Sequence, residues 1–237
     1  MTAQPSLLPS GHTAVMASRA PSIDGLDYFP TPPWAARAGA EIIARVDPGT
    51  WKVWEPACGG GHMAHGLTDY FGEPFATDVH DYGWPGCRIR DLDFLSAEAD
   101  ELTEFDWIIT NPPFVMGDEF VRAAWRRARR GVAMLLRLVF LEGGKRYRLL
   151  YEDCPLSIVA PFSERVPMVK GRWDPEASSA TAYAWFIWIK PDAGLPQPAH
   201  PILLPIPPGQ RTALSREGDV AAFNGLADAP LFGGAAA

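Results

Sequence analysis

The sequence has little cysteine, no long apolar run and no excess of positive charge. Its three cysteines are widely spaced and form no Cys-x-x-Cys pair, so we expect neither a disulfide framework nor a zinc site. No stretch approaches the roughly 18 uninterrupted apolar residues of a membrane helix, and no basic segment followed by an apolar one marks a secretory signal. These absences predict a protein of the reducing cytoplasm, with no membrane partner and no metal.

The charge balance excludes one kind of nucleic-acid protein. With 21 basic and 28 acidic residues the net charge is −7, whereas a protein that coats nucleic acid through bulk charge is usually basic. A local basic face is still compatible with this balance. The 47% apolar and 21% charged residues among 237 are typical of a soluble globular chain of one or two domains.

Proline divides the chain. Of 24 prolines, six lie in residues 1–33 and eight in residues 191–237. We therefore predict an N-terminal extension over 1–23, one folded domain over 24–190 and an extended proline-rich tail over 191–237. The tail either packs on the body through its apolar residues or extends away from it. Those apolar residues are Ile202, Leu203, Leu204 and Ile206.

Strand-like and helix-like segments alternate within the predicted domain. Apolar runs indicate strands over 51–54, 74–77, 105–110, 132–140, 156–160 and 180–190. Helical patterns indicate helices over 63–70, over 118–130 with Asp118 as its cap, and over 145–152. This alternation predicts an α/β protein with a mostly parallel sheet, which binds ligands at the carboxyl ends of its strands.

A glycine-rich loop follows the first of these strands. Three consecutive glycines, residues 59–61, let the backbone turn tightly and approach a ligand before the next helix begins. Glu55 precedes them, and Asp78 ends the next strand, where a carboxylate can accept hydrogen bonds from ribose hydroxyls. An ordinary tight turn with Asp78 as a cap is the alternative explanation.

The segment Glu55-Pro56-Ala57-Cys58-Gly59-Gly60-Gly61 resembles motif I of the class I S-adenosylmethionine-dependent methyltransferases. The resemblance implies a Rossmann-like fold with a seven-stranded, mostly parallel sheet and helices on both faces. It also implies that Gly59 and Gly61 pass close to the methionine part of S-adenosylmethionine and that Asp78 holds its ribose.

The most specific feature is Asn111-Pro112-Pro113-Phe114, which directly follows an apolar strand. Prolines fix the backbone and have no N–H, so their carbonyls stay free to accept hydrogen bonds. The Asn111 side chain adds an acceptor and Phe114 a flat face for stacking. Together they suit the gripping of a planar amino group during in-line attack on a methyl donor, a task of positioning. A rigid strand-to-loop turn is the alternative.

The tetrad resembles that of the amino-methyltransferases, and within them of small DNA adenine-N6 methyltransferases of phage or prophage type. Two further segments support this resemblance, although each is also compatible with an ordinary loop or turn. Phe29-x-Thr31-Pro32 is similar to their motif X, and Asp93-Phe94 to the motif that contacts the adenine of the donor. The cofactor-binding residues so implied are Phe29, Thr31, Pro32, Glu55, Pro56, Ala57, Gly59, Gly61, Asp78, Asp93, Phe94 and Asn111.

Positive charge gathers in one part of this acidic chain. Residues 118–148 contain nine basic and three acidic residues, and arginine suits phosphate contacts. A solvated helix face with internal ion pairs explains the pattern equally well. Trp173, if exposed, could stack on a base or fill the space of a flipped one. The candidate nucleic-acid-binding residues are Lys145, Arg146, Arg148, Arg165, Lys170, Arg172 and Trp173.

Three functions remain open on the sequence. The first is a DNA adenine-N6 methyltransferase, a monomer or a dimer, in which Asn111, Pro112, Pro113 and Phe114 form the catalytic site. The second is an amino-methyltransferase that acts on a protein glutamine or an RNA base. The third is a non-catalytic regulatory module that binds S-adenosylmethionine. His62 and His65 are interpreted as helix residues and not as metal ligands.

Overall fold

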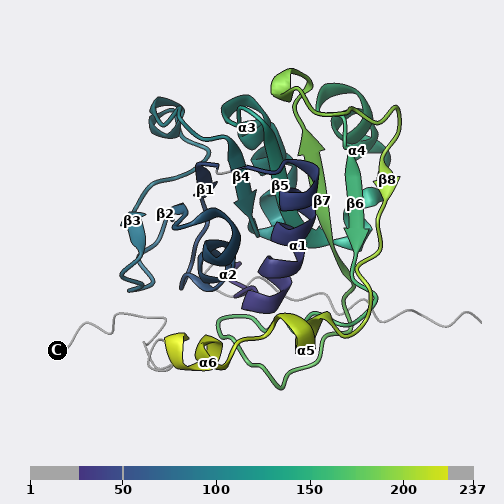
Figure 1. Cartoon of the computed structure of the whole chain (residues 1–237). Coiled ribbons are helices and arrows are strands. Elements are labelled where there is room, and N and C mark those ends of the chain that lie inside the picture. The colour runs from purple at the N-terminus through teal and green to yellow at the C-terminus, as the bar shows by residue number, and fades with distance from the viewer. Residues whose placement is uncertain (1–26, 50, 224–237) are drawn as a thin grey trace, which may run out of the picture.

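A central sheet with helices on both faces organises the chain (Figure 1). The computed structural model describes residues 27–49 and 51–223. Within this described part, the sheet has eight strands in the order β3-β2-β1-β4-β5-β7-β6-β8. β7 runs antiparallel to β5 and β6, and the other neighbours are parallel. The strands are β1 Val53–Glu55, β2 Phe75–Thr77, β3 Cys87–Ile89, β4 Trp107–Thr110, β5 Gly131–Arg137, β6 Ile158–Pro161, β7 Tyr183–Ile189 and β8 Ile202–Leu203.

The central strands are apolar on both sides because both faces of the sheet are covered. In β7, Trp185 and Ile187 belong to one buried cluster, whereas Phe186 and Trp188 belong to the other. Successive side chains of a strand point to opposite faces, so an uninterrupted apolar run supplies both cores. The predicted strand patterns therefore reflect burial on two sides.

Helices α1 and α2 cover one face of the sheet, and α3 and α4 cover the other (Figure 1). α1 and α2 approach closely at Gly66, which has no side chain: a Cβ there would lie only 2.6 Å from the Pro33 carbonyl oxygen. No helix among the described residues is long and apolar enough to cross a membrane. The helices are α1 Pro33–Val46, α2 His62–Phe71, α3 Gly117–Arg127, α4 Gly144–Arg148, α5 Gln210–Leu214 and α6 Glu217–Phe223.

The six predicted strands are confirmed as β1, β2, β4, β5, β6 and β7, and the three predicted helices as α2, α3 and α4. Two details differ. β5 ends at Arg137, because residues 138–141 form a 3-10 turn. Asp118 does not cap α3: the helix already begins at Gly117, and the Asp118 carboxylate accepts a hydrogen bond from Arg146 Nε at 2.9 Å.

The sheet has eight strands where the resemblance implied seven, because the segment after residue 190 adds β8 to the edge of the sheet. This segment, which we expected to be extended throughout, also contains α5 and α6. Of its apolar residues Ile206 is buried, whereas Ile202, Leu203 and Leu204 remain exposed. The predicted extension over 1–23 and the last part of the predicted tail, 224–237, lie outside the described residues.

Candidate active site

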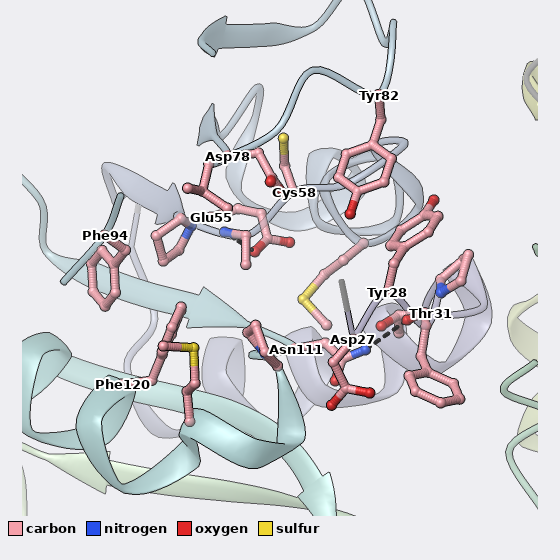
Figure 2. A pocket seen from close by; sticks show the side chains of 18 of the residues that line it. Asp27, Tyr28, Thr31, Glu55, Cys58, Asp78, Tyr82, Phe94, Asn111 and Phe120 are labelled. Carbon is pink, nitrogen blue, oxygen red and sulfur yellow. Dashed lines mark hydrogen bonds between the residues drawn. The ribbon is translucent and has the colours of Figure 1, made fainter. Parts of the chain in front are cut away.

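A cavity opens at the carboxyl ends of β1, β2 and β4, where parallel α/β sheets bind ligands. The glycine-rich loop, the segment over 27–31 and the start of the chain after β4 surround it (Figure 2). Ten of the residues predicted from the sequence line it. These are Phe29, Thr31, Glu55, Pro56, Ala57, Asp78, Asp93, Phe94, Asn111 and Pro113.

Asn111 is fixed in one orientation. Its Nδ2 donates a hydrogen bond to the Phe29 carbonyl oxygen at 2.9 Å, the dashed line in Figure 2. Its Oδ1 is buried and has no hydrogen-bond partner among the described residues. A buried acceptor without a partner costs free energy, so this oxygen is available for a donor that the described part of the chain does not supply.

The two prolines of the tetrad behave differently. We expected both carbonyls to stay free, but the Pro113 carbonyl accepts a hydrogen bond from Met116 N at 2.9 Å as the chain turns towards α3. Pro112 is buried directly after Asn111. Pro112 is thus the proline whose carbonyl remains the candidate second acceptor.

The Phe114 ring is already surrounded by other groups. It contacts the rings of Phe29 and Tyr183, with centroids 5.3 and 5.8 Å away, and the Arg137 guanidinium lies 4.5 Å from its centroid. Its N–H donates to Asp27 Oδ2 at 2.8 Å. Phe114 is therefore packed against other side chains, and the Arg137 guanidinium already lies over the ring on which we expected a base to stack.

Glu55 is fully buried at the end of β1. Its Oε1 accepts hydrogen bonds from Thr110 Oγ1 at 2.6 Å and from Ala57 N at 3.2 Å. Burial nevertheless raises the pKa of Glu55 to about 8, because desolvation outweighs these hydrogen bonds and the charge of Asp78 adds to it. At neutral pH this carboxyl is therefore mostly protonated in the free protein.

Asp78 follows β2 and connects it to the glycine-rich loop. One carboxylate oxygen accepts from Gly59 N at 2.8 Å and the other from His80 N at 2.9 Å. Burial raises the pKa of Asp78, and the two backbone hydrogen bonds oppose this shift. A carboxylate has about four lone-pair sites, so acceptor capacity remains for a ligand.

The glycines determine the shape of the loop and how closely its neighbours approach. Gly59 and Gly61 have φ of +51° and +83°, a region that favours glycine. A Cβ on Gly59 would lie 2.3 Å from the Tyr28 ring, and a Cβ on Gly61 would lie 2.1 Å from the Trp84 ring. Neither glycine is among the residues that the structure places on the cavity wall. They let two aromatic rings pack closely against the loop.

The two segments that supported the resemblance, residues 29–32 and 93–94, both reach the cavity. Phe29 and Thr31 are buried in its wall, whereas Pro32 is the N-cap residue of α1 and lies behind it. Phe94 is buried with its ring 5.1 Å from that of Trp54. The exposed Asp93 accepts a hydrogen bond from Leu95 N within its own turn. Both segments therefore contribute an apolar wall.

Most of the predicted basic residues have intramolecular partners. Arg146 Nε lies 2.9 Å from Asp118, Arg148 Nε 3.0 Å from Asp153 and Arg172 Nη2 3.1 Å from Asp174. Arg165 donates to the Ala180 carbonyl, and Lys145 is exposed. The internal ion pairs that we considered as the alternative are present.

Trp173 is not the exposed residue that we considered. It is half-buried, its ring lies 5.6 Å from His62 and 5.8 Å from Phe223, and its Nε1 is buried without a partner among the described residues. The sequence could not show this, because Phe223 lies 50 residues further along the chain. Among the described residues, no group of three His, Cys, Asp or Glu side chains could hold a metal ion.

Sequence reasoning missed half of the cavity wall. Two of the additional lining residues, Pro30 and Cys58, stand at positions inside the quoted motifs to which we gave no role, and most of the others flank the predicted residues in the chain. The additional lining residues are Asp27, Tyr28, Pro30, Cys58, His62, Met63, Val79, Tyr82, Met116 and Phe120.

No family model and no curated protein matches the sequence. Among solved structures, a Listeria monocytogenes protein provisionally assigned to the class I S-adenosylmethionine-dependent methyltransferases superimposes with a TM-score of 0.56 and 12% identity, covering 89% of this chain and 73% of that one. The methyltransferase subunit of a type I restriction-modification system from Streptococcus thermophilus superimposes with a TM-score of 0.53 and 17% identity, covering 69% of this chain and 45% of that one. This chain thus spans about half the length of that subunit.

The fold is therefore that of the class I S-adenosylmethionine-dependent methyltransferases. The resemblance seen in the sequence is confirmed at this level.

Proposed function

We propose that the protein is an S-adenosylmethionine-dependent methyltransferase that methylates the N6 amino group of adenine in DNA. The observation that carries the proposal is the Asn111 side chain, whose buried Oδ1 has no partner within residues 27–49 and 51–223, while its Nδ2 donates to the Phe29 carbonyl oxygen. An oriented, unused acceptor on a cavity wall suits a ligand that donates hydrogen, as an amino group does.

Three features of the cavity support binding of the methyl donor there. Asp78 retains acceptor capacity for ribose hydroxyls, and Phe94 offers an apolar wall for a purine. Glu55 lies beside them and can ionise when a cationic group approaches. S-adenosylmethionine supplies an electrophilic methyl group on a sulfonium.

The residues of this chain act by orientation. Asn111 Oδ1 and the Pro112 carbonyl accept the two amino hydrogens, which directs the lone pair of the nitrogen towards the methyl group. As the nitrogen becomes positively charged, both acceptors interact with it more strongly, which lowers the barrier. No side chain needs to remove a proton before the methyl group is transferred: the N–C bond would form as the C–S bond of the sulfonium breaks, and the methylated amino group would then lose one proton to water.

DNA as the acceptor has separate support. The tetrad resembles that of adenine-N6 enzymes, and the Streptococcus thermophilus neighbour is the methyltransferase subunit of a restriction-modification system. The exposed Lys145 lies on the same strand-end side as the cavity and is the first candidate for a phosphate contact. Arg146, Arg148, Arg165, Lys170 and Arg172 remain further candidates.

The decisive experiment uses methyl-labelled S-adenosylmethionine with unmethylated DNA, RNA and cell-extract protein in parallel reactions. After digestion of the DNA to nucleosides, we expect label in N6-methyldeoxyadenosine. Label only in RNA or protein would move the proposal to the second acceptor class. Binding of the donor without transfer to any acceptor would favour the regulatory module.

The variant Asn111→Ala tests the role that we assign to the Asn111 side-chain oxygen. We expect transfer to fall by at least about 100-fold, since one preorganised acceptor is lost in the transition state, while the affinity for S-adenosylhomocysteine changes little. Gln197→Ala is the matched control, because this amide lies at the surface and donates to the Lys190 carbonyl. Unaltered turnover of Asn111→Ala would contradict the assigned role.

A further inference from the structure

Two polar atoms face the same small space beside Gly60 in the glycine-rich loop. A Cβ on Gly60 would lie 2.8 Å from Tyr28 Oη and 3.3 Å from His62 Nδ1. Tyr28 Oη accepts a hydrogen bond from Gly60 N at 3.1 Å. His62 Nδ1 is buried and has no hydrogen-bond partner among the described residues. Both residues line the cavity.

Both groups can donate hydrogen. Burial raises the pKa of the Tyr28 phenol, so it keeps its proton at neutral pH and can donate while accepting from Gly60. Burial, with a smaller contribution from His65, lowers the pKa of His62 to about 3. The imidazole is therefore neutral and able to carry its one hydrogen on Nδ1.

His62 is held in place by the C-terminal segment. Its ring stacks on Phe223 of α6, with centroids 3.9 Å apart and an interplanar angle of 15°. The ring of Trp173 contacts both residues edge-on. A residue beyond the predicted domain thus covers one face of an imidazole in the cavity wall.

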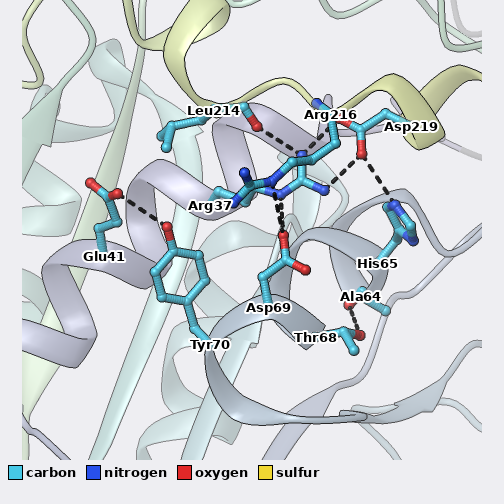
Figure 3. Close-up of polar contacts among 10 residues, drawn as sticks. All are labelled: Arg37, Glu41, Ala64, His65, Thr68, Asp69, Tyr70, Leu214, Arg216 and Asp219. Atoms are coloured by element: carbon cyan, nitrogen blue, oxygen red, sulfur yellow. Dashed lines mark hydrogen bonds and ion pairs between the residues drawn. The ribbon is translucent and has the colours of Figure 1, made fainter.

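A buried ion pair fixes α6 in this position (Figure 3). Arg37 of α1 donates to both carboxylate oxygens of Asp219, at 2.7 Å each, and to Asp69 at 2.6 Å. His65 Nε2 lies 3.1 Å from the same Asp219 carboxylate. The side chains of Arg37 and Asp219 are 1% and 5% exposed, so the contact is shielded from solvent.

We propose that the C-terminal segment completes the cofactor site: Phe223 positions His62, which together with the Tyr28 hydroxyl and the N-terminus of α2 binds the carboxylate of the donor. This inference rests on the proposed function. The N-terminus of the ten-residue α2 favours an anion, and the carboxylate is the only anionic group of S-adenosylmethionine. The unused Nδ1 is the independent observation that points to a ligand at this place.

The test compares two ligands on the full chain by calorimetry. S-adenosylhomocysteine has the carboxylate, whereas 5′-methylthioadenosine has the same nucleoside without the amino-acid end. We expect His62→Ala to weaken S-adenosylhomocysteine about 10-fold or more, the loss of one hydrogen bond to a charged group, and to leave methylthioadenosine within about twofold. His62→Asn, which places an amide N–H near the lost Nδ1, is expected to recover part of the difference.

Phe223→Ala tests the positioning role. It is expected to reduce the affinity for S-adenosylhomocysteine several-fold and to change the affinity for methylthioadenosine little. Phe223→Tyr, which keeps an aromatic ring, is expected to bind S-adenosylhomocysteine about as tightly as the wild type. Val220→Ala on the exposed side of α6 and His200→Ala in an exposed loop are the matched controls.

Each remaining outcome overturns a definite statement. If His62→Ala or Phe223→Ala weakens both ligands equally, or abolishes both, these residues support the fold and not the carboxylate. If neither variant changes either affinity, the carboxylate binds elsewhere. If the wild-type protein binds neither ligand, the proposed function itself fails.

Discussion

The ion pair that joins Arg37 of α1 to Asp219 of α6 is buried, whereas the ion pair between Arg148 of α4 and Asp153 is open to solvent. Arg37 and Asp219 are 1% and 5% exposed, but in the pair between Arg148 and Asp153 the arginine is 75% exposed. Burial makes a missing partner costly, while solvent and salt weaken an exposed pair. The buried pair is thus held firmly in the folded protein, whereas the exposed pairs of α3 and α4 cost little to separate.

The largest effect should come from breaking the buried pair. Arg37→Met is expected to lower the free energy of unfolding by about 3–5 kcal/mol, because the Asp219 carboxylate would stay buried without the guanidinium that balances its charge. Urea denaturation measures the loss. The double variant Arg37→Met with Asp219→Leu is expected to regain part of it, since it buries no unpaired charge. If Arg37→Met lowers the free energy of unfolding no more than the loss of an exposed pair does, the contrast between the buried and the exposed pairs is wrong.

A change at Glu55 should give an effect that is set by pH and is smaller than that of Arg37→Met within any one pH unit. The pKa of Glu55 is about 8 in the folded protein against 4.5 ordinarily, so the folded state holds an extra proton between these values. Stability should therefore fall as pH rises from about 5 to 8, by up to about 1.4 kcal/mol per pH unit. Glu55→Gln is expected to flatten this dependence. Parallel stability curves of the two proteins from pH 5 to 8 would show that Glu55 ionises normally.

The smallest effect should come from the exposed side. Arg148→Ser is expected to lower the free energy of unfolding by less than about 1 kcal/mol, and the difference should shrink further in high salt. The measurement is urea denaturation at two salt concentrations. A loss of several kcal/mol, or one that salt does not reduce, would place this arginine in the same category as Arg37.

Most of the sheet and the residues at its strand ends could be predicted from the sequence. Buried strands such as β4 and β5 give apolar runs, and Asn111 and Asp78 follow such runs directly. The same logic could not find α1, because its start lies in a proline-rich stretch and its buried face includes Arg37. Short elements such as β3, β8 and α5 hold too few residues to show a period.

The side-chain partners were beyond the reach of local patterns. Nothing near Phe114 in the sequence indicates that Arg137 lies over its ring, and nothing near His62 points to Phe223. These pairs depend on the tertiary course of the chain, which brings β5 and α6 to the cavity from distant positions. Prediction therefore succeeded for residues defined by their own strand and failed for contacts between separate elements.

The pairing of Arg37 with Asp219 joins residues that are 182 positions apart. During synthesis the ribosome releases α1 long before α6, so the Arg37 guanidinium has no Asp219 carboxylate to pair with until 182 further residues have been made. Until then, Asp69 is its available acidic partner. The α1–α2 layer can therefore reach its final stability only after translation has passed residue 219, and truncated products should lack it.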